Sequence, residues 1–200
     1  MSEPIDAIFI AVGGGGLISG IGCYIKSIRP DIKIIGVQTT DSDAMIRSIE
    51  NGKRIKLKHV GIFSDGTAVK QVGTETFKLA KIVVDDFCIV SADEICAATR
   101  DIFEDTRTIQ EPAGAMALAG LKKYVSLHGN KQKLDNLVAI TCGANVNFDR
   151  LRIIAERSEL GENKEALLAI SLPEQRGSFL KLCETLGNRH ITEFNYRMED

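Results

Sequence analysis

The sequence predicts an α/β fold, a doubly wound and mainly parallel sheet with helices on both faces. The first observation behind this prediction is that short runs are apolar throughout, as strands covered on both faces must be. The second is that segments with helical spacing separate these runs. The third is an ordinary globular composition, with 44% hydrophobic and 26% charged residues over 200 positions. Together they favour one sizeable domain, with room for part of a second.

The amino-terminal elements follow in strand–helix order. A buried strand is expected at Ala7–Val12, and a helix at Leu17–Ile28 ends before Pro30. A second buried strand is expected at Ile32–Gln38. The next helix lies in the segment DSDAMIRSIENGK, which starts with residue types that cap helices and closes on Asn-Gly.

The middle of the sequence is less periodic before the alternation resumes. Residues 53–70 are predicted to form a loop that contains FSDGTAV, with a turn at its Asp-Gly pair. A helix is expected at Thr74–Lys81 and a short strand at Phe87–Val90. The four residues from Ser91 to Glu94 match a capping box, which predicts a helix that continues to about Thr106.

Three further elements complete a predicted sheet domain at residues 1–160. Small residues dominate the segment EPAGAMALAGLKKYV, so this helix is expected to pack very closely against the sheet. A buried strand at Asn136–Thr141 leads into the turn CGAN, and a helix is expected at Phe148–Ser158.

The pattern changes after GENKE, and residues 165–200 are predicted to belong to a second domain. A strand is expected at Leu167–Leu172, a helix in RGSFLKLCETLG, and a strand of alternating polarity at Ile191–Arg197. This β-α-β order predicts the incomplete start of a small α+β domain.

Composition and charge argue against several classes of protein. The 25 basic and 27 acidic residues give a formal charge of −2 and form no long run of one sign, which disfavours nucleic-acid binding. No apolar run approaches the roughly 20 residues that cross a bilayer, and no signal-peptide pattern is present. The five cysteines form no CxxC pair and no zinc spacing, so we expect no metal site and a reducing, cytoplasmic environment: Cys23, Cys88, Cys96, Cys142 and Cys183.

Four consecutive glycines, Gly13, Gly14, Gly15 and Gly16, stand between the first strand and its helix. A helix N-terminus offers unpaired N–H groups and a partial positive charge, and glycine lets an anion approach the backbone closely. The dinucleotide fingerprint fails because Leu17 occupies its third position, and the P-loop fails because no Lys-Ser/Thr pair follows Gly20. The pattern therefore indicates a terminal phosphate held mainly by backbone amides. The alternative is a tight helix–sheet crossing that requires small residues.

A second strand also ends in a glycine turn, at Cys142 in AITCGAN. In an open α/β sheet, ligands bind outside the carboxyl ends of the strands. The glycines and Cys142 both lie at such ends, so one ligand is expected to contact both. The alternative for Cys142 alone is a buried structural thiol.

The segments VGGGGL, EPAGA and TCGAN, in this order, resemble the pyridoxal-phosphate enzymes of the tryptophan-synthase-like fold (fold type II). Within them the chain is most similar to the biosynthetic threonine dehydratases. The resemblance extends through FSDGTAV and DEICAATRDIFEDTR to TEFNYR, which is similar to the start of an ACT-like regulatory domain that senses isoleucine and valine.

The resemblance implies a cofactor, a reaction and a set of binding residues. The cofactor is pyridoxal 5′-phosphate, with its phosphate at Gly13–Gly16 and Leu17, its pyridine nitrogen facing Cys142 and its ring near Glu111. The alternative for Glu111 is a helix-start carboxylate. The implied reaction converts L-threonine, and less well L-serine, to a 2-oxo acid and ammonia, which for threonine is 2-oxobutanoate, a step in isoleucine biosynthesis.

The chain also departs from the family pattern. The family's Schiff-base lysine lies in a Ser-Phe-Lys-like motif upstream of the glycines, and no lysine of this sequence has such a context, so the catalytic lysine is expected outside the chain. We therefore expect a segment that lacks the N-terminal lobe, has little activity alone, and works as a homo-oligomer or with a partner chain that carries the missing lobe. A plastid location is expected if the source is a plant.

Two alternatives stay open. The first is another enzyme of the same fold, a serine dehydratase or serine racemase, and the regulatory-like tail argues against it. The second is a non-catalytic or partner-dependent binding segment, which the absence of the lysine motif favours.

Overall fold

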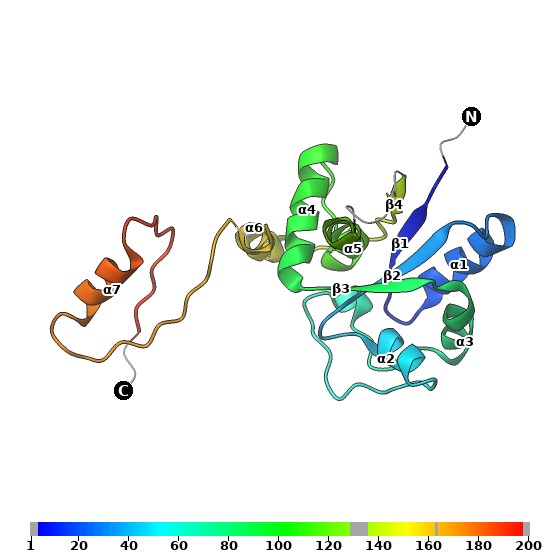
Figure 1. Ribbon diagram of the computed structural model, residues 1–200, viewed down its shortest axis with the longest axis horizontal. Helices are drawn as coiled ribbons and strands as arrows, with labels where there is room; N and C mark the ends of the chain where they lie inside the picture. The colour runs from blue at the N-terminus through cyan, green and yellow to red at the C-terminus, as the bar shows by residue number, and fades with distance from the viewer. Residues whose placement is uncertain (1–3, 129–135, 163, 198–200) are drawn as a thin grey trace. The chain divides into compact units, whose positions relative to one another are not determined.

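The computed structural model describes residues 4–128, 136–162 and 164–197. The chain forms two compact units, residues 1–166 and residues 167–200 (Figure 1). The first unit holds the sheet and most of the helices, so it positions every residue of the predicted site.

The sheet of the first unit has four parallel strands in the order β3-β2-β1-β4. Strand β1 pairs with β2 over Ala7–Ala11 and with β4 over Ala7–Phe9, so β1 is an interior strand. The predicted doubly wound parallel sheet is confirmed. Its strands are β1 (Ala7–Ala11), β2 (Lys33–Thr39), β3 (Asp86–Val90) and β4 (Leu137–Ala139).

Helices cover both faces of this sheet (Figure 1). The helices of the first unit are α1 (Gly16–Ile28), α2 (Ala44–Glu50), α3 (Thr74–Val83), α4 (Ala92–Thr106), α5 (Pro112–His128) and α6 (Phe148–Gly161), with a 3₁₀ turn, η1 (Asp65–Thr67). No helix in the described ranges has the length and hydropathy that crossing a bilayer requires.

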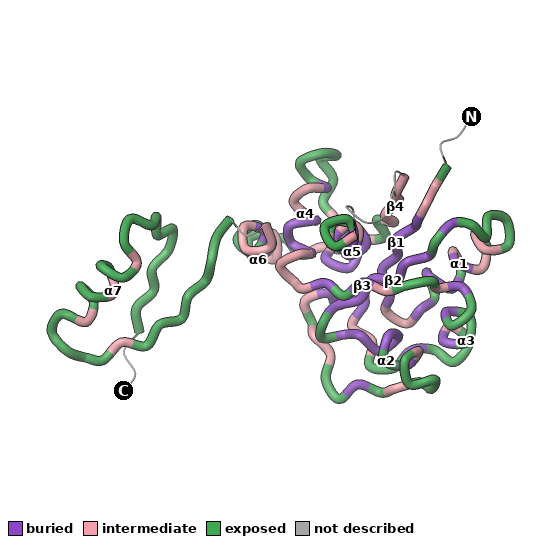
Figure 2. Tube along the Cα trace, viewed as in Figure 1, coloured by how far each residue is buried: buried purple, intermediate pink, exposed green. Residues whose placement is uncertain are grey.

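The alternation of side chains along β1 divides the core into two layers. Ile8, Ile10 and Val12 pack with α1, α2 and α3, whereas Phe9 and Ala11 pack with α4 and α5. Figure 2 shows β1 buried along its length, and β2 is buried from Ile34 to Thr39, which explains why these two strands are apolar rather than alternating. Strands β3 and β4 are only partly buried.

Helix α5 lies very close to the sheet, as its small residues predict. Ala113, Ala115, Ala117 and Ala119 are buried, and a Cβ atom added at Gly120 would overlap the Val37 side chain of β2. This close approach fixes the start of α5, and with it Glu111, relative to the carboxyl ends of the strands.

Helix α4 begins at the predicted capping box, and ion pairs join it to α6, among them the pair between Asp93 of α4 and Arg157 of α6. Ser91 Oγ accepts a hydrogen bond from Glu94 N at 3.2 Å, and Glu94 Oε2 accepts one from Ser91 N at 2.7 Å. Arg100 forms ion pairs with Glu159 and Glu162 at the end of α6. The hydrogen bonds from Lys164 and Arg100 lower the pKa of Glu162 to about 2, so this carboxylate is ionised at neutral pH.

The second unit contains the predicted helix but neither predicted strand. Helix α7 (Ser178–Leu186) forms, and the rings of Phe179 and Phe194 lie 5.3 Å apart. The predictions of strands at Leu167–Leu172 and Ile191–Arg197 were wrong, since neither segment is paired in the described residues. A strand needs a hydrogen-bonded neighbour to satisfy its N–H and C=O groups, and in the described residues neither segment pairs with one. Strand β4 is shorter than the predicted Asn136–Thr141, since three residues pair with β1 in the described chain, although Asn136 O and Ile140 N also hydrogen-bond to Asp6 N and Phe9 O.

Candidate functional site

The glycine loop, Gly13–Gly16, joins the carboxyl end of β1 to the start of α1. Gly15 has φ 91°, a left-handed conformation that side chains disfavour. A Cβ atom added at Gly13 would lie 3.0 Å from Thr67 Cα, and one at Gly15 would overlap Met45. At Gly14 and Gly16 nothing lies within 4 Å of the added atom. Two of the glycines are therefore required by packing, whereas the other two border open space.

The backbone of the glycine loop offers unpaired donors to that open space. Among the residues that the structure describes, none accepts a hydrogen bond from the N–H groups of residues 13–18, and the first intrahelical-type bond is Ser19 N to Gly15 O at 3.0 Å. Leu17 lies in the first turn of α1 and is 41% exposed. Unpaired N–H groups, the helix dipole and uncovered glycines together fit the phosphate of a cofactor.

The Cys142 turn, Thr141–Asn145, packs against the start of α5. Glu111 N donates to Gly143 O at 3.1 Å, and Cys142 Sγ lies 3.8 Å from Ala113 O. A Cβ atom added at Gly143 would overlap the Glu111 carboxylate. Cys142 and Glu111, predicted from different motifs, are therefore neighbours.

A bridging segment, Ser64–Val69, joins the glycine loop to the Cys142 turn. Thr67 packs against Gly13, and the preceding residue, Gly66, packs against α5. A Cβ atom added at Gly66 would lie 2.9 Å from Ala113 Cβ and 3.5 Å from Glu111 Oε1. The segment is held by hydrogen bonds from Ser42 Oγ to Thr67 O and from Thr67 Oγ1 to Ser64 O, both 3.0 Å long. All seven predicted residues thus border one region at the carboxyl ends of β1 and β4.

Sequence reasoning missed several residues that support this region. Gln38 is buried at the end of β2, donates to Val12 O and Ser42 O at 3.1 Å each, and accepts from Ile46 N at 3.0 Å. It therefore fixes the chain directly before the glycine loop. A polar residue at the end of an apolar strand was the available signal. Thr67 lay within FSDGTAV, but nothing in that loop's sequence indicated that it reaches Gly13.

The surroundings of Cys142 favour its neutral thiol over the thiolate. Loss of hydration among its neighbours, and then the charge of Glu111, raise the pKa of Cys142 above its ordinary value. Burial also raises the pKa of Cys88 to about 11 and that of Cys96 to about 12. In the described ranges no group of three or more His, Cys, Asp or Glu side chains is placed to hold a metal ion.

We predict that Glu111→Gln makes Cys142 more reactive. Removing the carboxylate charge lowers the pKa of the thiol and increases its thiolate fraction, so alkylation by iodoacetamide at pH 8 should become about twofold to fivefold faster. Peptide mass spectrometry measures the rate at each cysteine, and the exposed Cys183 of the second unit is the internal control. An unchanged rate at Cys142 would show that Glu111 does not act on it.

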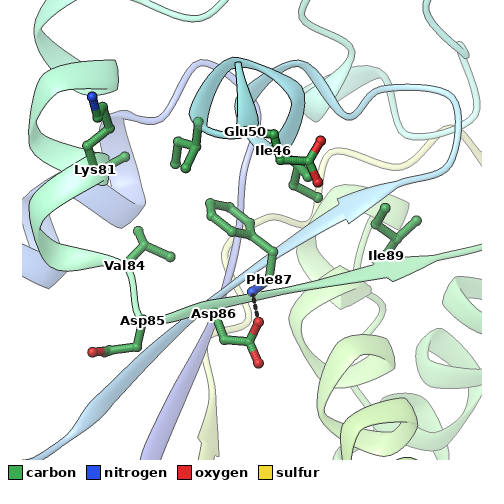
Figure 3. Close-up of a pocket in the computed structure, with 10 residues that line it drawn as sticks. Ile46, Glu50, Lys81, Val84, Asp85, Asp86, Phe87 and Ile89 are labelled. Carbon is green, nitrogen blue, oxygen red and sulfur yellow. Dashed lines mark hydrogen bonds between the residues drawn. The ribbon is translucent and has the colours of Figure 1, made fainter. Parts of the chain in front are cut away.

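A surface pocket of about 370 Å³ lies apart from this region, beside the outer edge of β3. Figure 3 shows Phe87 of β3 between Ile46 and Glu50 of α2 and Lys81 and Val84 at the end of α3. Helix α3 begins near the glycine loop and ends at this pocket, so about 15 Å of helix separates the two. None of the predicted site residues lines it.

Two family models match the sequence. The model described as "Pyridoxal-phosphate dependent enzyme" matches residues 1–143, which include the glycine loop, Glu111 and Cys142. The model described as "C-terminal regulatory domain of Threonine dehydratase" matches residues 156–200.

Individual relatives agree with these models. The chain is 53% identical over 197 residues to the L-threonine dehydratase biosynthetic IlvA of Burkholderia multivorans, covering 98% of this chain and 38% of that protein. The processed form of threonine deaminase isoform 2 from Solanum lycopersicum is a structural neighbour, with TM-score 0.75 and 41% identity, covering 78% of this chain and 45% of that one. The serine racemase of Dictyostelium discoideum has TM-score 0.66 and 33% identity, covering 74% and 46%. The chain therefore spans less than half the length of these proteins.

Proposed function

Because the chain belongs to the pyridoxal-phosphate dependent enzyme family, we propose that it forms part of the cofactor site of a threonine dehydratase, which converts L-threonine to 2-oxobutanoate and ammonia. The observation that carries the proposal is the bridging segment, which joins a loop of unpaired amides on one side to Glu111 and Cys142 on the other. One ligand with a phosphate and a ring can contact both.

The first group of residues in this proposal binds the phosphate of the cofactor. The amides of Gly13, Gly14, Gly15, Gly16 and Leu17 hold the phosphate, since they are unpaired and lie at the positive end of α1. When bound, the cofactor supplies electron withdrawal from the substrate's α-carbon. The protein binds and orients it.

Cys142 faces the pyridine nitrogen in this proposal, with Glu111 beside the ring. The raised pKa of Cys142 favours the neutral thiol, which would donate a hydrogen bond to that nitrogen without protonating it. A carboxylic acid there would transfer its proton more fully and increase electron withdrawal. The weaker donor favours prompt loss of the β-hydroxyl over side reactions. The Schiff-base lysine is assigned to none of the lysines in this sequence.

The proposal extends to the division of the chain and to its biological role. Residues 1–160 contribute the cofactor site, and residues 165–200 begin an ACT-like domain that binds an isoleucine- or valine-type effector, in keeping with the regulatory-domain match. We place the chain in isoleucine biosynthesis, in a homo-oligomer or beside a lobe that carries the lysine. A cytoplasmic or plastid location fits its five unpaired cysteines.

The similarity to serine racemase keeps a second reaction open, because that enzyme shares the fold. The regulatory-domain match favours threonine dehydration. Comparing L-threonine with L-serine as substrates, in an assay to which the lysine-bearing lobe has been added, decides between them. Formation of 2-oxobutanoate faster than pyruvate supports the proposal, and racemisation of serine overturns it.

Cofactor binding is tested with pyridoxamine 5′-phosphate and pyridoxamine, which have no aldehyde and do not react with surface lysines. We expect the purified chain to bind the phosphorylated form at least about tenfold more tightly, since each hydrogen bond to a charged group contributes about 1.5–3 kcal/mol. Gly14→Ala should fold normally, because open space surrounds the added methyl, yet lose most of that preference.

Gly20→Ala is the matched control, since Gly20 lies in α1 with nothing within 4 Å of an added Cβ. It should retain the full phosphate preference. A wild-type chain that binds both compounds equally would refute the phosphate site. Borohydride reduction with pyridoxal phosphate, followed by peptide mass spectrometry, tests the lysine: a single stoichiometric adduct with turnover would show that a lysine of this chain performs that role.

A further inference from the structure

We infer that the Thr76 hydroxyl is a positioning group for the glycine loop: it orients the peptide between Gly14 and Gly15 and so directs the Gly15 amide that binds phosphate. The inference rests on the proposed function, because it assigns a role in the same phosphate site. Thr76 lies in the first turn of α3, far from the GGGG motif in the sequence.

The first observation is a hydrogen bond across 62 residues of sequence. Thr76 Oγ1 donates to Gly14 O at 2.6 Å, and Gly73 N approaches the same carbonyl at 3.4 Å. Thr76 Oγ1 also lies 3.3 Å from Gly73 O. A hydroxyl has one proton to donate, and the much shorter distance assigns it to the Gly14 carbonyl.

The second step follows from peptide geometry. In a trans peptide the C=O and the following N–H point in opposite directions. Because the Gly14 carbonyl points toward α3, the Gly15 N–H points away from it. No acceptor for this N–H lies among the described residues, so the amide is available to an anion.

The third observation is that Thr76 is itself held in place. Ser19 Oγ of α1 donates to Thr76 O at 3.0 Å, which ties the first turns of the two helices together. Phe77 and Ala80 anchor α3 in the core beside β1. A Cβ atom added at Gly15 would lie 3.0 Å from Thr76 Cβ, so the glycine is what permits this close approach. The hydroxyl therefore acts from a rigid position.

The test compares three variants of the chain by titration with pyridoxamine 5′-phosphate and with pyridoxamine. Thr76→Val keeps the shape but removes the donor, and we expect about threefold to tenfold weaker binding of the phosphorylated compound, as for the loss of one neutral hydrogen bond. Binding of pyridoxamine should be unchanged. Thr76→Ser restores the hydroxyl and should restore the phosphate preference. Thr74→Val, at the exposed start of the same helix, should have no effect.

The outcomes separate this inference from the proposed function. Equal weakening of both compounds by Thr76→Val, or no rescue by Thr76→Ser, would reduce Thr76 to a structural role and overturn the inference. An unchanged phosphate preference in Thr76→Val would also overturn it, while leaving the phosphate site intact. If the wild-type chain shows no phosphate preference, the proposed function fails first.

Discussion

Replacing Gly15 with alanine is expected to abolish phosphate binding and to destabilise the first unit. Its φ of 91° costs an alanine about 1–2 kcal/mol, and the added methyl would overlap Met45 and crowd Thr76, for a further 1–2 kcal/mol or so. We expect the free energy of unfolding, measured in urea, to fall by about 2–4 kcal/mol.

The effect on binding should exceed the effect on folding. Alanine disfavours the φ of 91°, so the peptides on either side of residue 15 should turn, and these carry the amides assigned to the phosphate. Loss of two hydrogen bonds to a charged group corresponds to a more than about 100-fold weaker affinity for pyridoxamine 5′-phosphate. Affinity for pyridoxamine should change little.

Gly20→Ala serves as the control for Gly15→Ala, because both place a methyl near the start of α1 and only one meets other atoms. We expect Gly20→Ala to be neutral or stabilising by up to about 1 kcal/mol, as alanine is the better helix former. If Gly15→Ala matched this control in stability and phosphate affinity, the left-handed loop would not be required for the site.

Replacing Gly114 with alanine is expected to separate the Cys142 turn from α5. An added Cβ would overlap Gly143 O, lie 2.9 Å from Gly143 N and lie 2.8 Å from Gln110 Oε1. Backbone atoms cannot move aside as a side chain can, so the hydrogen bond from Glu111 N to Gly143 O should break. We expect a loss of about 2–4 kcal/mol in unfolding free energy.

Gly114→Ala should weaken the binding of both compounds, whereas Gly15→Ala should weaken the binding of the phosphorylated compound alone. Pyridoxamine and its phosphate should both bind more weakly by a similar factor, because the ring contacts are lost while the phosphate loop stays intact. Alkylation of Cys142 should become faster as its turn leaves α5. A selective loss of phosphate preference in this variant would contradict the assignment of Cys142 and Glu111 to the ring.

Local pattern was sufficient to predict most elements of the first unit. The apolar runs at β1 and β2 and the helical spacing of α1 and α3 are properties of adjacent residues, as is the capping box at Ser91. The order of strands and helices then dictates a parallel sheet, and the carboxyl ends of its strands dictate where a ligand binds. This reasoning alone predicted that the glycine loop and the Cys142 turn lie at the carboxyl ends of two strands.

The local sequence pattern could not predict which segments of the chain pair with one another as strands. The segments Leu167–Leu172 and Ile191–Arg197 have strand-like sequences, but a strand exists only beside a partner, and in the described residues neither has one.

The sequence by itself determined most elements of the first unit, the family resemblance and the residues that we propose to face a phosphate and a pyridine ring. Only the tertiary structure decided that Thr67 lies against Gly13, that Gly66 lies against α5 beside Glu111, and that Thr76 holds the Gly14 carbonyl. The physical reason is that these contacts join residues about 45 to 60 positions apart, whose distance depends on how whole helices pack on the sheet. Spacing within one element carries no information about that packing.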